Sequence, residues 1–210
     1  MYSRRVGKRT LTFGHEGLLY KNSFVLYDRE TGSLWVHTTG EAVRGPLKGQ
    51  QLQFLPAVVT SWKKWKAEHP DTGVLTGRRA DGFMGDFNLS LNPRLYGLSV
   101  GSGKHVKLYP FETLRKERIV NDEYDGKKLV VVYDDATGSG VAFERGDLTF
   151  RKGRGGRMVD PSGREWNMLQ GASGDQSLTP VPATPWLIER WIAFYRPREA
   201  RPSAPTPPGR

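Results

Sequence analysis

The chain has no cysteine, so disulfide bonds, thiolate nucleophiles and cysteine-ligated metals are excluded from its chemistry. It also lacks any apolar run approaching the roughly 18 residues of a membrane-spanning helix. Residues 1–5 lack the apolar core of a signal peptide. We therefore expect the chain as written in the cytoplasm, and in the periplasm or outside the cell if a signal sequence lies upstream of Met1.

Acidic residues are scarce relative to basic ones, 22 against 32, which gives a formal net charge of +10. Most of the excess lies at the two ends, in residues 1–9 and 196–210. A nucleic-acid surface instead gathers basic and aromatic side chains on one folded face, so the sequence disfavours nucleic acid as a partner. One internal basic stretch, Arg151–Arg157, is interrupted by glycines. We interpret it as a solvated loop, with a phosphate-binding loop as the alternative.

What the chain does have is glycine and proline, 25 and 14 residues, which favour short strands and tight turns. Three blocks of sequence also occur twice with the same internal spacing. The matched residues are Leu11–Phe13 with Leu148–Phe150, then Gly32, Trp35 and Gly40 with Gly163, Trp166 and Gly171, and finally Leu52, Pro56 and Ala57 with Leu178, Pro182 and Ala183. A fixed spacing between two turn glycines and a tryptophan indicates that one supersecondary unit is built twice.

Two helices are predicted, and each bears tryptophan and precedes a proline. The first begins at residue 60 or 61 and ends at Glu68. The second covers residues 185–195, because Thr184 is a suitable N-cap and Pro185 suits the first helical position. The second helix is apolar around nearly its whole circumference, so we expect it to be buried or to lie in an interface.

Strands account for most of the remaining sequence. The period-two alternation of a sheet with one wet face occurs at residues 10–13, 33–35 and 51–54. Leu129–Tyr133 is continuously apolar, which predicts a central strand, paired with residues 118–120 through the Asp125-Gly126 turn. A second hairpin joins residues 95–100 to 105–108.

We therefore expect an α+β, β-rich protein with two homologous antiparallel-sheet lobes from an internal duplication, each ending in a short tryptophan-bearing helix. The expected divisions are a first lobe at residues 1–76 that is incomplete at its N-terminus, a linker at 77–94, a second lobe at 95–197, and a disordered proline- and arginine-rich tail at 198–210.

Longer stretches of the sequence resemble a known family. They are FGHEGLLYKNSFVLYDRETGSLW, TGEAVRGPLKG, LQFLPA and SWKKWKAEHPDT in the first half, and IVNDEYDGKKLVVVYD and LTFRKGRGGRMVDPSGREWNML in the second. On these stretches, residues 4–197 closely resemble the bacterial and archaeal family catalogued as domain of unknown function 3179 (DUF3179). The resemblance implies a tandem duplication and brings no assigned activity.

The same resemblance implies a further half-unit, with a Cys-Pro-x-Cys-Gly turn, ahead of the first lobe. Without that half-unit the first sheet has an unpaired edge strand, which invites homodimerisation.

Candidate metal ligands are His15 and His37, which could meet across a sheet with Glu16 or Glu41 as a third ligand. None of the histidines has the four-residue helical spacing of a metal site, so turn and surface positions are the preferred interpretation. The sequence predicts no bound metal and no cofactor.

Asp28 and Glu30 have the composition of an acid–base pair, but the sequence from Asp28 to Gly32 is typical of a turn held by its aspartate. Trp35 and Trp166 could stack on a sugar or a base, yet their repetition in matched strands favours core packing. No serine has the Gly-x-Ser-x-Gly context of an exposed nucleophile.

The leading hypothesis is a non-catalytic binding or scaffold module that holds a ligand or partner between the lobes near His15, Asp28, Trp35 and Glu41. The first alternative is a cell-envelope enzyme or metal/redox protein whose active groups include the further N-terminal segment. The second is a weak nucleic-acid binder through the basic termini, whose affinity would fall steeply with salt.

Overall fold

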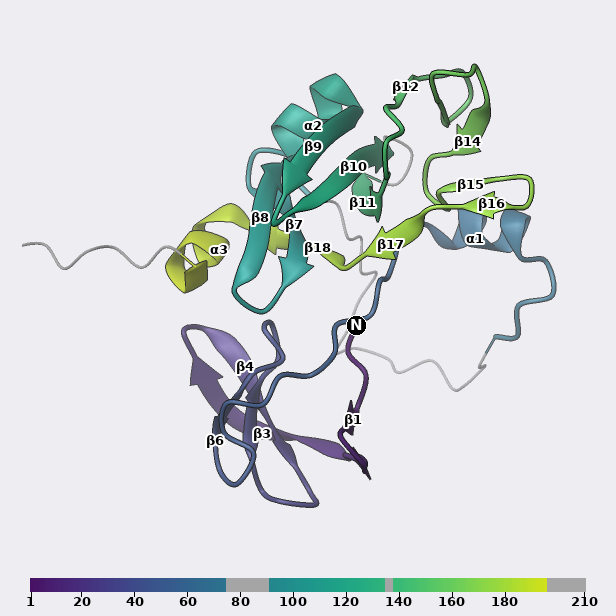
Figure 1. Ribbon diagram of the computed structural model, residues 1–210. Coiled ribbons are helices and arrows are strands. Elements are labelled where there is room, and N and C mark those ends of the chain that lie inside the picture. Colours follow the sequence, from purple (N-terminus) through teal and green to yellow (C-terminus); the bar gives the residue numbers. More distant parts are fainter. Residues whose placement is uncertain (75–90, 135–137, 196–210) are drawn as a thin grey trace, which may run out of the picture.

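The computed structural model describes residues 1–74, 91–134 and 138–195 (Figure 1). These residues form five antiparallel sheets of short strands and three short helices, which confirms the prediction of a β-rich protein with antiparallel sheets. Within them, no helix has the length and apolar character needed to cross a bilayer. Most of the expected linker at 77–94 and all of the expected tail at 198–210 lie outside the described residues.

The N-terminal region, residues 1–55, is built around a four-stranded antiparallel meander. We call this sheet the first meander. Its strands are β3 (Phe13–Tyr20), β4 (Ser23–Asp28), β5 (Leu34–Val36) and β6 (Ala42–Arg44), and a two-stranded ribbon of β1 (Arg5–Val6) and β2 (Arg9–Thr10) precedes them. Its buried core contains Leu11, Trp35, Ala42 and Leu52.

The prediction of a strand at residues 51–54 is wrong. In the described part of the chain this segment makes only isolated bridges, from Gln51 to Glu41 and from Phe54 to Tyr2. Leu52 is buried between them. The alternation in sequence therefore reflects one-sided burial. No ladder forms, because the segment passes from a bridge with Glu41 to a bridge with Tyr2.

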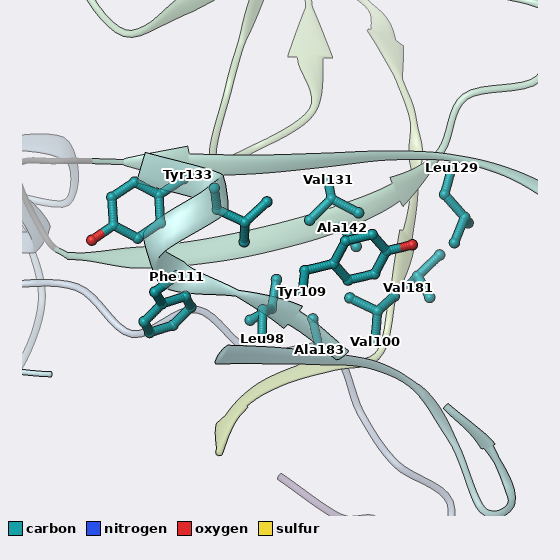
Figure 2. Close-up of a cluster of buried hydrophobic side chains, with 11 residues drawn as sticks. Leu98, Val100, Tyr109, Phe111, Leu129, Val131, Tyr133, Ala142, Val181 and Ala183 are labelled. Carbon is teal, nitrogen blue, oxygen red and sulfur yellow. The ribbon is translucent and has the colours of Figure 1, made fainter. Parts of the chain in front are cut away.

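The C-terminal region, residues 91–195, packs two sheets on a common core. One contains β18 (Ala183–Leu187), β7 (Tyr96–Ser102) and β8 (His105–Pro110), and the other contains β17 (Thr179–Val181), β11 (Ser139–Glu144), β10 (Lys127–Asp134) and β9 (Ile119–Tyr124), in these spatial orders. Helix α2 (Phe111–Glu117) joins β8 to β9. Figure 2 shows side chains of β10 and β7 facing one another in this core, where Leu98 and Val131 are completely buried.

Strand β10 is central and buried on both faces, as the continuous apolar run predicted. Its hairpin with β9 is confirmed: Val131 lies opposite Val120, and Asp125 and Gly126 have φ values of 53° and 72°. Those positive values are the ones that a type I′ turn requires. The predicted hairpin of β7 and β8 is confirmed as well, with Ser102 opposite His105.

A five-stranded sheet, the second meander, covers the other face of β10. Its strands are β12 (Arg151–Lys152), β13 (Arg157–Val159), β14 (Glu165–Asn167), β15 (Ala172–Ser173) and β16 (Gln176–Ser177). Val130 and Val132 of β10 share a buried cluster with Met158 and Trp166 of this sheet. Full burial of a valine side chain contributes about 1.5–3 kcal/mol, so this contact fixes the second meander on the C-terminal region.

Helix α3 spans Ile188–Tyr195, so the start predicted at residue 185 is wrong. Pro185 and Trp186 belong to β18, in which Pro185 lies opposite Leu98. Because β18 is an edge strand, a proline there can be tolerated without a missing ladder bond. The same residue that suits a first helical turn also suits a sheet edge, and the pairing with a distant strand decides between them.

Helix α1 (Trp62–Glu68) begins as predicted, after Ser61, whose hydroxyl accepts a hydrogen bond from the Lys64 N–H at 3.3 Å. It does not cover the first meander. Lys64 Nζ instead pairs with Asp134 Oδ2 of the C-terminal region at 2.8 Å, and Trp65 of α1 lines a pocket with Leu169 and Gln170 of the same region.

The two meanders have corresponding internal contacts. Trp35 Nε1 donates to Asp28 at 2.8 Å, and Trp166 Nε1 donates to Asp160 at 3.0 Å. Each indole also meets a phenylalanine edge to face, with ring centroids 5.9 Å apart for Phe13 and Trp35 and 5.7 Å for Phe150 and Trp166. The predicted core positions of both tryptophans are confirmed, since Trp35 is 0% exposed and Trp166 is 3% exposed.

Candidate functional site

A cleft lies between the first meander and the β18–α3 segment of the C-terminal region. Its volume is about 440 Å³, within the range of roughly 300–1,000 Å³ that is usual for small-molecule sites. The N-terminal region contributes Tyr2, Lys21, His37 and Phe54 to its lining. The C-terminal region contributes Tyr96, Trp186, Arg190 and Phe194.

A tight turn brings Lys21 to the cleft. Tyr20 and Ser23 are paired across β3 and β4, which leaves Lys21 and Asn22 as a two-residue loop with φ values of 47° and 61°. These are the left-handed conformations of a type I′ hairpin, which asparagine tolerates well. The turn directs Lys21 toward α3, where its Nζ lies 5.4 Å from the centroid of the Phe194 ring, a cation–π geometry.

Aromatic rings form much of the cleft wall. Trp186 packs edge to face with Phe194 at 5.4 Å, and Tyr2 packs edge to face with Phe54 at 5.0 Å. Trp186 lies in β18 and not in the helix that the sequence predicted, and this strand brings its indole to the cleft. Such rings offer flat apolar surfaces on which a ring or an aliphatic chain can pack.

Polar groups interrupt this wall. The Tyr2 hydroxyl donates to the Thr38 carbonyl oxygen at 2.5 Å, and the hydroxyls of Ser23 and Thr38 are 2.9 Å apart. Burial, with a smaller effect from Tyr195, raises the pKa of Tyr2 well above its usual value. Burial likewise lowers the pKa of His37 below 6.5. Both groups are therefore neutral at pH 7, and the charged side chains in the lining are Lys21 and Arg190.

Asp28 and Trp35 lie inside the first meander and do not line the cleft. The Asp28 carboxylate accepts from the Thr31 N–H at 2.6 Å and from Trp35 Nε1 at 2.8 Å. Burial acts to raise its pKa, but the hydrogen bonds from Trp35, Thr31 and Ser33 outweigh burial and hold the pKa below 3.8. Glu30, its expected partner in an acid–base pair, instead accepts from the Thr12 N–H at 2.8 Å. Asp28 thus holds the turn, as the turn interpretation predicted, and Glu30 ties the turn to the residue that precedes β3.

His15 and Glu41 are exposed and lie outside the cleft lining. His15 packs against Phe24, with centroids 5.2 Å apart, and His37 packs against the same ring at 6.1 Å. The structure thus places the two histidines on a common aromatic side chain. The charge of Glu41 acts on Tyr195, whose pKa is raised first by burial and then by this charge. Among the residues that the structure describes, no three His, Asp or Glu side chains converge as metal ligands.

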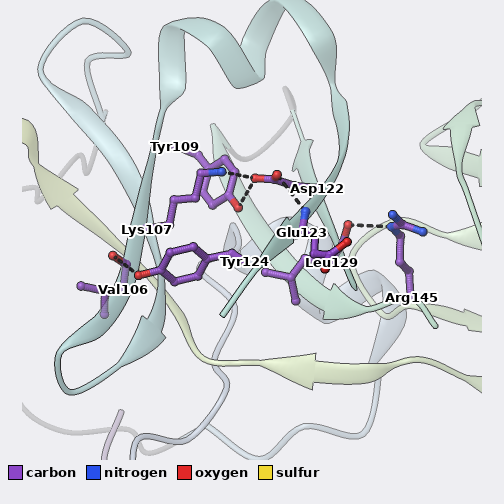
Figure 3. Close-up of polar contacts among 8 residues, drawn as sticks. All are labelled: Val106, Lys107, Tyr109, Asp122, Glu123, Tyr124, Leu129 and Arg145. Carbon is purple, nitrogen blue, oxygen red and sulfur yellow. Dashed lines mark hydrogen bonds and ion pairs between the residues drawn. The ribbon is translucent and has the colours of Figure 1, made fainter. Parts of the chain in front are cut away.

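A separate polar network lies in the C-terminal region (Figure 3). Asp122 accepts from Lys107 Nζ at 2.6 Å and from the Tyr109 hydroxyl at 2.7 Å. Burial and the bond to Asp122 raise the pKa of Tyr109 well above its usual value. Asp122 itself has a lowered pKa, because the bonds from Lys107 and Tyr109 outweigh the opposing effect of burial. The carboxylate is fully engaged within the fold, so this network joins β8 to β9.

Sequence reasoning missed most of the cleft residues. Tyr2 and Phe54 meet only through a long-range bridge, and Lys21 is one of many exposed lysines. One signal was present: the apolar circumference of the C-terminal helix predicted burial or an interface, and Phe194 of that helix lines the cleft.

In the comparison with known proteins, a family model matches the N-terminal part of the chain. The model of the family described as protein of unknown function (DUF3179) matches residues 1–94. That segment contains the whole first meander, with the turn held by Asp28 and the N-terminal side of the cleft. No curated protein and no solved structure matches the chain. The match over residues 1–94 supports the assignment of the chain to the DUF3179 family.

Proposed function

We propose that this protein is a non-catalytic binding module whose site is the cleft between the first meander and the β18–α3 segment. The observation that carries the proposal is the lining: aromatic rings from both regions together with two cationic side chains, Lys21 and Arg190. An apolar cleft with a few placed polar groups is the usual form of a ligand site. The two cations favour a ligand or partner segment that carries negative charge.

The carboxylates in and around the first meander support a binding role over a catalytic one. Asp28 and Glu30 both accept backbone hydrogen bonds and both have lowered pKa values. A general acid that works near neutral pH needs the opposite shift. In this proposal Asp28 and Trp35 hold the sheet that supports the cleft, and the exposed His15 and Glu41 are available to the outer parts of a larger partner.

We further infer that the two meanders are copies from an internal duplication, each with its own tryptophan–aspartate pair. The inference is supported by matched main-chain hydrogen bonds as well as by sequence. Gly40 N–H bonds to Val36 O at 2.7 Å, and Gly171 N–H bonds to Asn167 O at 2.9 Å. Leu52 N–H then bonds to Gly40 O at 2.9 Å, and Leu178 N–H bonds to Gly171 O at 2.8 Å.

Anilinonaphthalene sulfonate (ANS), an aromatic anion that fluoresces in apolar clefts, tests the binding proposal. We expect saturable binding of one ANS per chain, weakened about tenfold by Arg190→Glu, because the substitution replaces attraction with repulsion at the cleft. Arg154→Glu makes the same charge change on an exposed loop of the second meander and serves as the matched control. Non-saturable binding, or equal weakening by both variants while the circular dichroism spectra remain native, would remove the cleft as a site.

A further inference from the structure

Phe143 of β11, in the C-terminal region, has a neighbouring strand on each side. It lies between two strands, opposite Pro180 of β17 on one side and opposite Val130 of β10 on the other. Its ring packs on Gly171, where an added Cβ would meet the ring at 2.6 Å. Because Pro180 has no N–H, the main-chain N–H and C=O of Phe143 are directed to Val130.

Tyr2, in the N-terminal region, shares two of these contacts, the pairing on one side and the packing on a glycine. It lies opposite Phe54, and its ring packs on Gly40, where an added Cβ would also meet the ring at 2.6 Å. The flanking bonds run from Ser3 N–H to Gln53 O and from Leu55 N–H to Met1 O, both 2.8–2.9 Å. In an antiparallel pair with that pattern, the N–H and C=O of Tyr2 itself point away from Phe54. Neither group bonds to any residue that the structure describes.

We infer that the cleft takes an extended peptide segment of a partner protein, which pairs with the main chain of Tyr2 as Val130 pairs with Phe143. The inference rests on the proposed function and names the occupant of that site. Met1 and Tyr2 both line the cleft, so the cavity and the main-chain groups that have no partner among the described residues share the same stretch of chain. Addition of a strand to an open sheet edge is a common mode of peptide recognition, in which main-chain bonds give affinity and side-chain pockets give specificity.

The lining indicates the chemistry of the segment. Val130 and Val132 are completely buried against the second meander, so the matching positions of the segment are expected to be β-branched and apolar. Trp186 and Phe194 provide the apolar surface on the opposite wall. Lys21 and Arg190 favour acidic residues at an end of the segment, whereas a basic segment is repelled.

The test uses the whole protein and an acetylated peptide with the sequence of β10, in which glutamate replaces Lys127 and Lys128. Its binding is measured by displacement of ANS and by calorimetry. We expect one peptide per chain. N-methylation of the peptide residue that corresponds to Val130 removes the N–H that would bond to the Tyr2 carbonyl, and we expect about tenfold weaker binding from the loss of that bond. The N-methylated peptide keeps every side chain, so it is the matched control for apolar contact alone.

Each outcome has one meaning. Equal affinity for the two peptides overturns strand pairing, because side-chain contact then accounts for the binding. Saturable binding of ANS without binding of either peptide overturns the inference and leaves the proposed function intact, whereas failure of both probes removes both. Sedimentation equilibrium completes the test: a dimer that excludes the peptide identifies a second copy as the occupant and also overturns the inference.

Discussion

Replacement of Asp28 tests whether the tryptophan–aspartate pair holds the first meander together. Asp28 is 0% exposed, and so is Trp35, whose indole N–H donates to it at 2.8 Å. Asp28→Ala leaves that N–H without an acceptor in a place that water does not reach. A buried donor left without an acceptor costs about 1–3 kcal/mol, and loss of the bonds from half-buried Thr31 brings the total to about 2–4 kcal/mol. Asp28→Asn retains one acceptor oxygen and is expected to cost about 1–2 kcal/mol.

The assay is urea unfolding followed by far-ultraviolet circular dichroism, which does not depend on the tryptophan signal. A double-mutant cycle with Trp35→Phe isolates the pair, since phenylalanine removes the donor and keeps an aromatic ring in the core. We expect Asp28→Ala to cost about 1–2 kcal/mol less in the Trp35→Phe background, because the stranded N–H is then absent. The same cost in both backgrounds would refute the reasoning and assign the loss to the Thr31 turn.

The remaining predictions concern the C-terminal region. Hydrogen bonds from Ser162 lower the pKa of Asp160 to about 2, although burial acts in the opposite direction. The contribution of Asp160 to stability is therefore complete above pH 4 and is lost as the pH falls toward 2. The urea midpoint of an Asp160→Asn variant should depend less on pH over that window. Gly171→Ala combines a φ of 62° with a Cβ 2.6 Å from the Phe143 ring, whereas Gly174→Ala has a φ of 55° and open space around its Cβ. Gly171→Ala should therefore lower the free energy of unfolding by about 1–2 kcal/mol more than Gly174→Ala. Equal losses would show that the Phe143 ring moves aside freely. Leu98→Ala, at a completely buried position, should cost about 2–5 kcal/mol in the same urea assay, and a loss below 1 kcal/mol would mean that the core contact in β7 is dispensable.

Elements set by local chemistry were predictable from the sequence. The Asp125-Gly126 turn requires two left-handed residues, and it has them. The N-cap of α1 at Ser61 and the turn held by Asp28 likewise depend on groups within a few residues of one another. At these positions the residue type alone restricts the conformation, so no knowledge of the tertiary structure is needed.

Elements decided by distant partners were not predictable. Pro185 is equally suited to a helix start and to an edge strand, and its pairing with Leu98 selects the strand. Helix α1 is joined to the C-terminal region by the ion pair between Lys64 and Asp134, which lie far apart in sequence. The cleft was missed for the same reason, because residues from six separate segments must come together before its lining exists.

The comparison of Tyr2 with Phe143 connects the fold to the proposed site. Both rings pack on a glycine with positive φ, and both residues pair with the segment that follows their own meander. Around Phe143 the core is closed, because Val130 satisfies its main chain and the valines of β10 cover the sheet. Around Tyr2 the same packing ends at a cleft, and the main-chain N–H and C=O of Tyr2 bond to none of the residues that the structure describes. Main-chain groups of this kind are costly to leave open, since they can pair with any extended chain. We expect the aromatic walls and the cations that flank them to restrict that pairing to apolar segments with acidic ends.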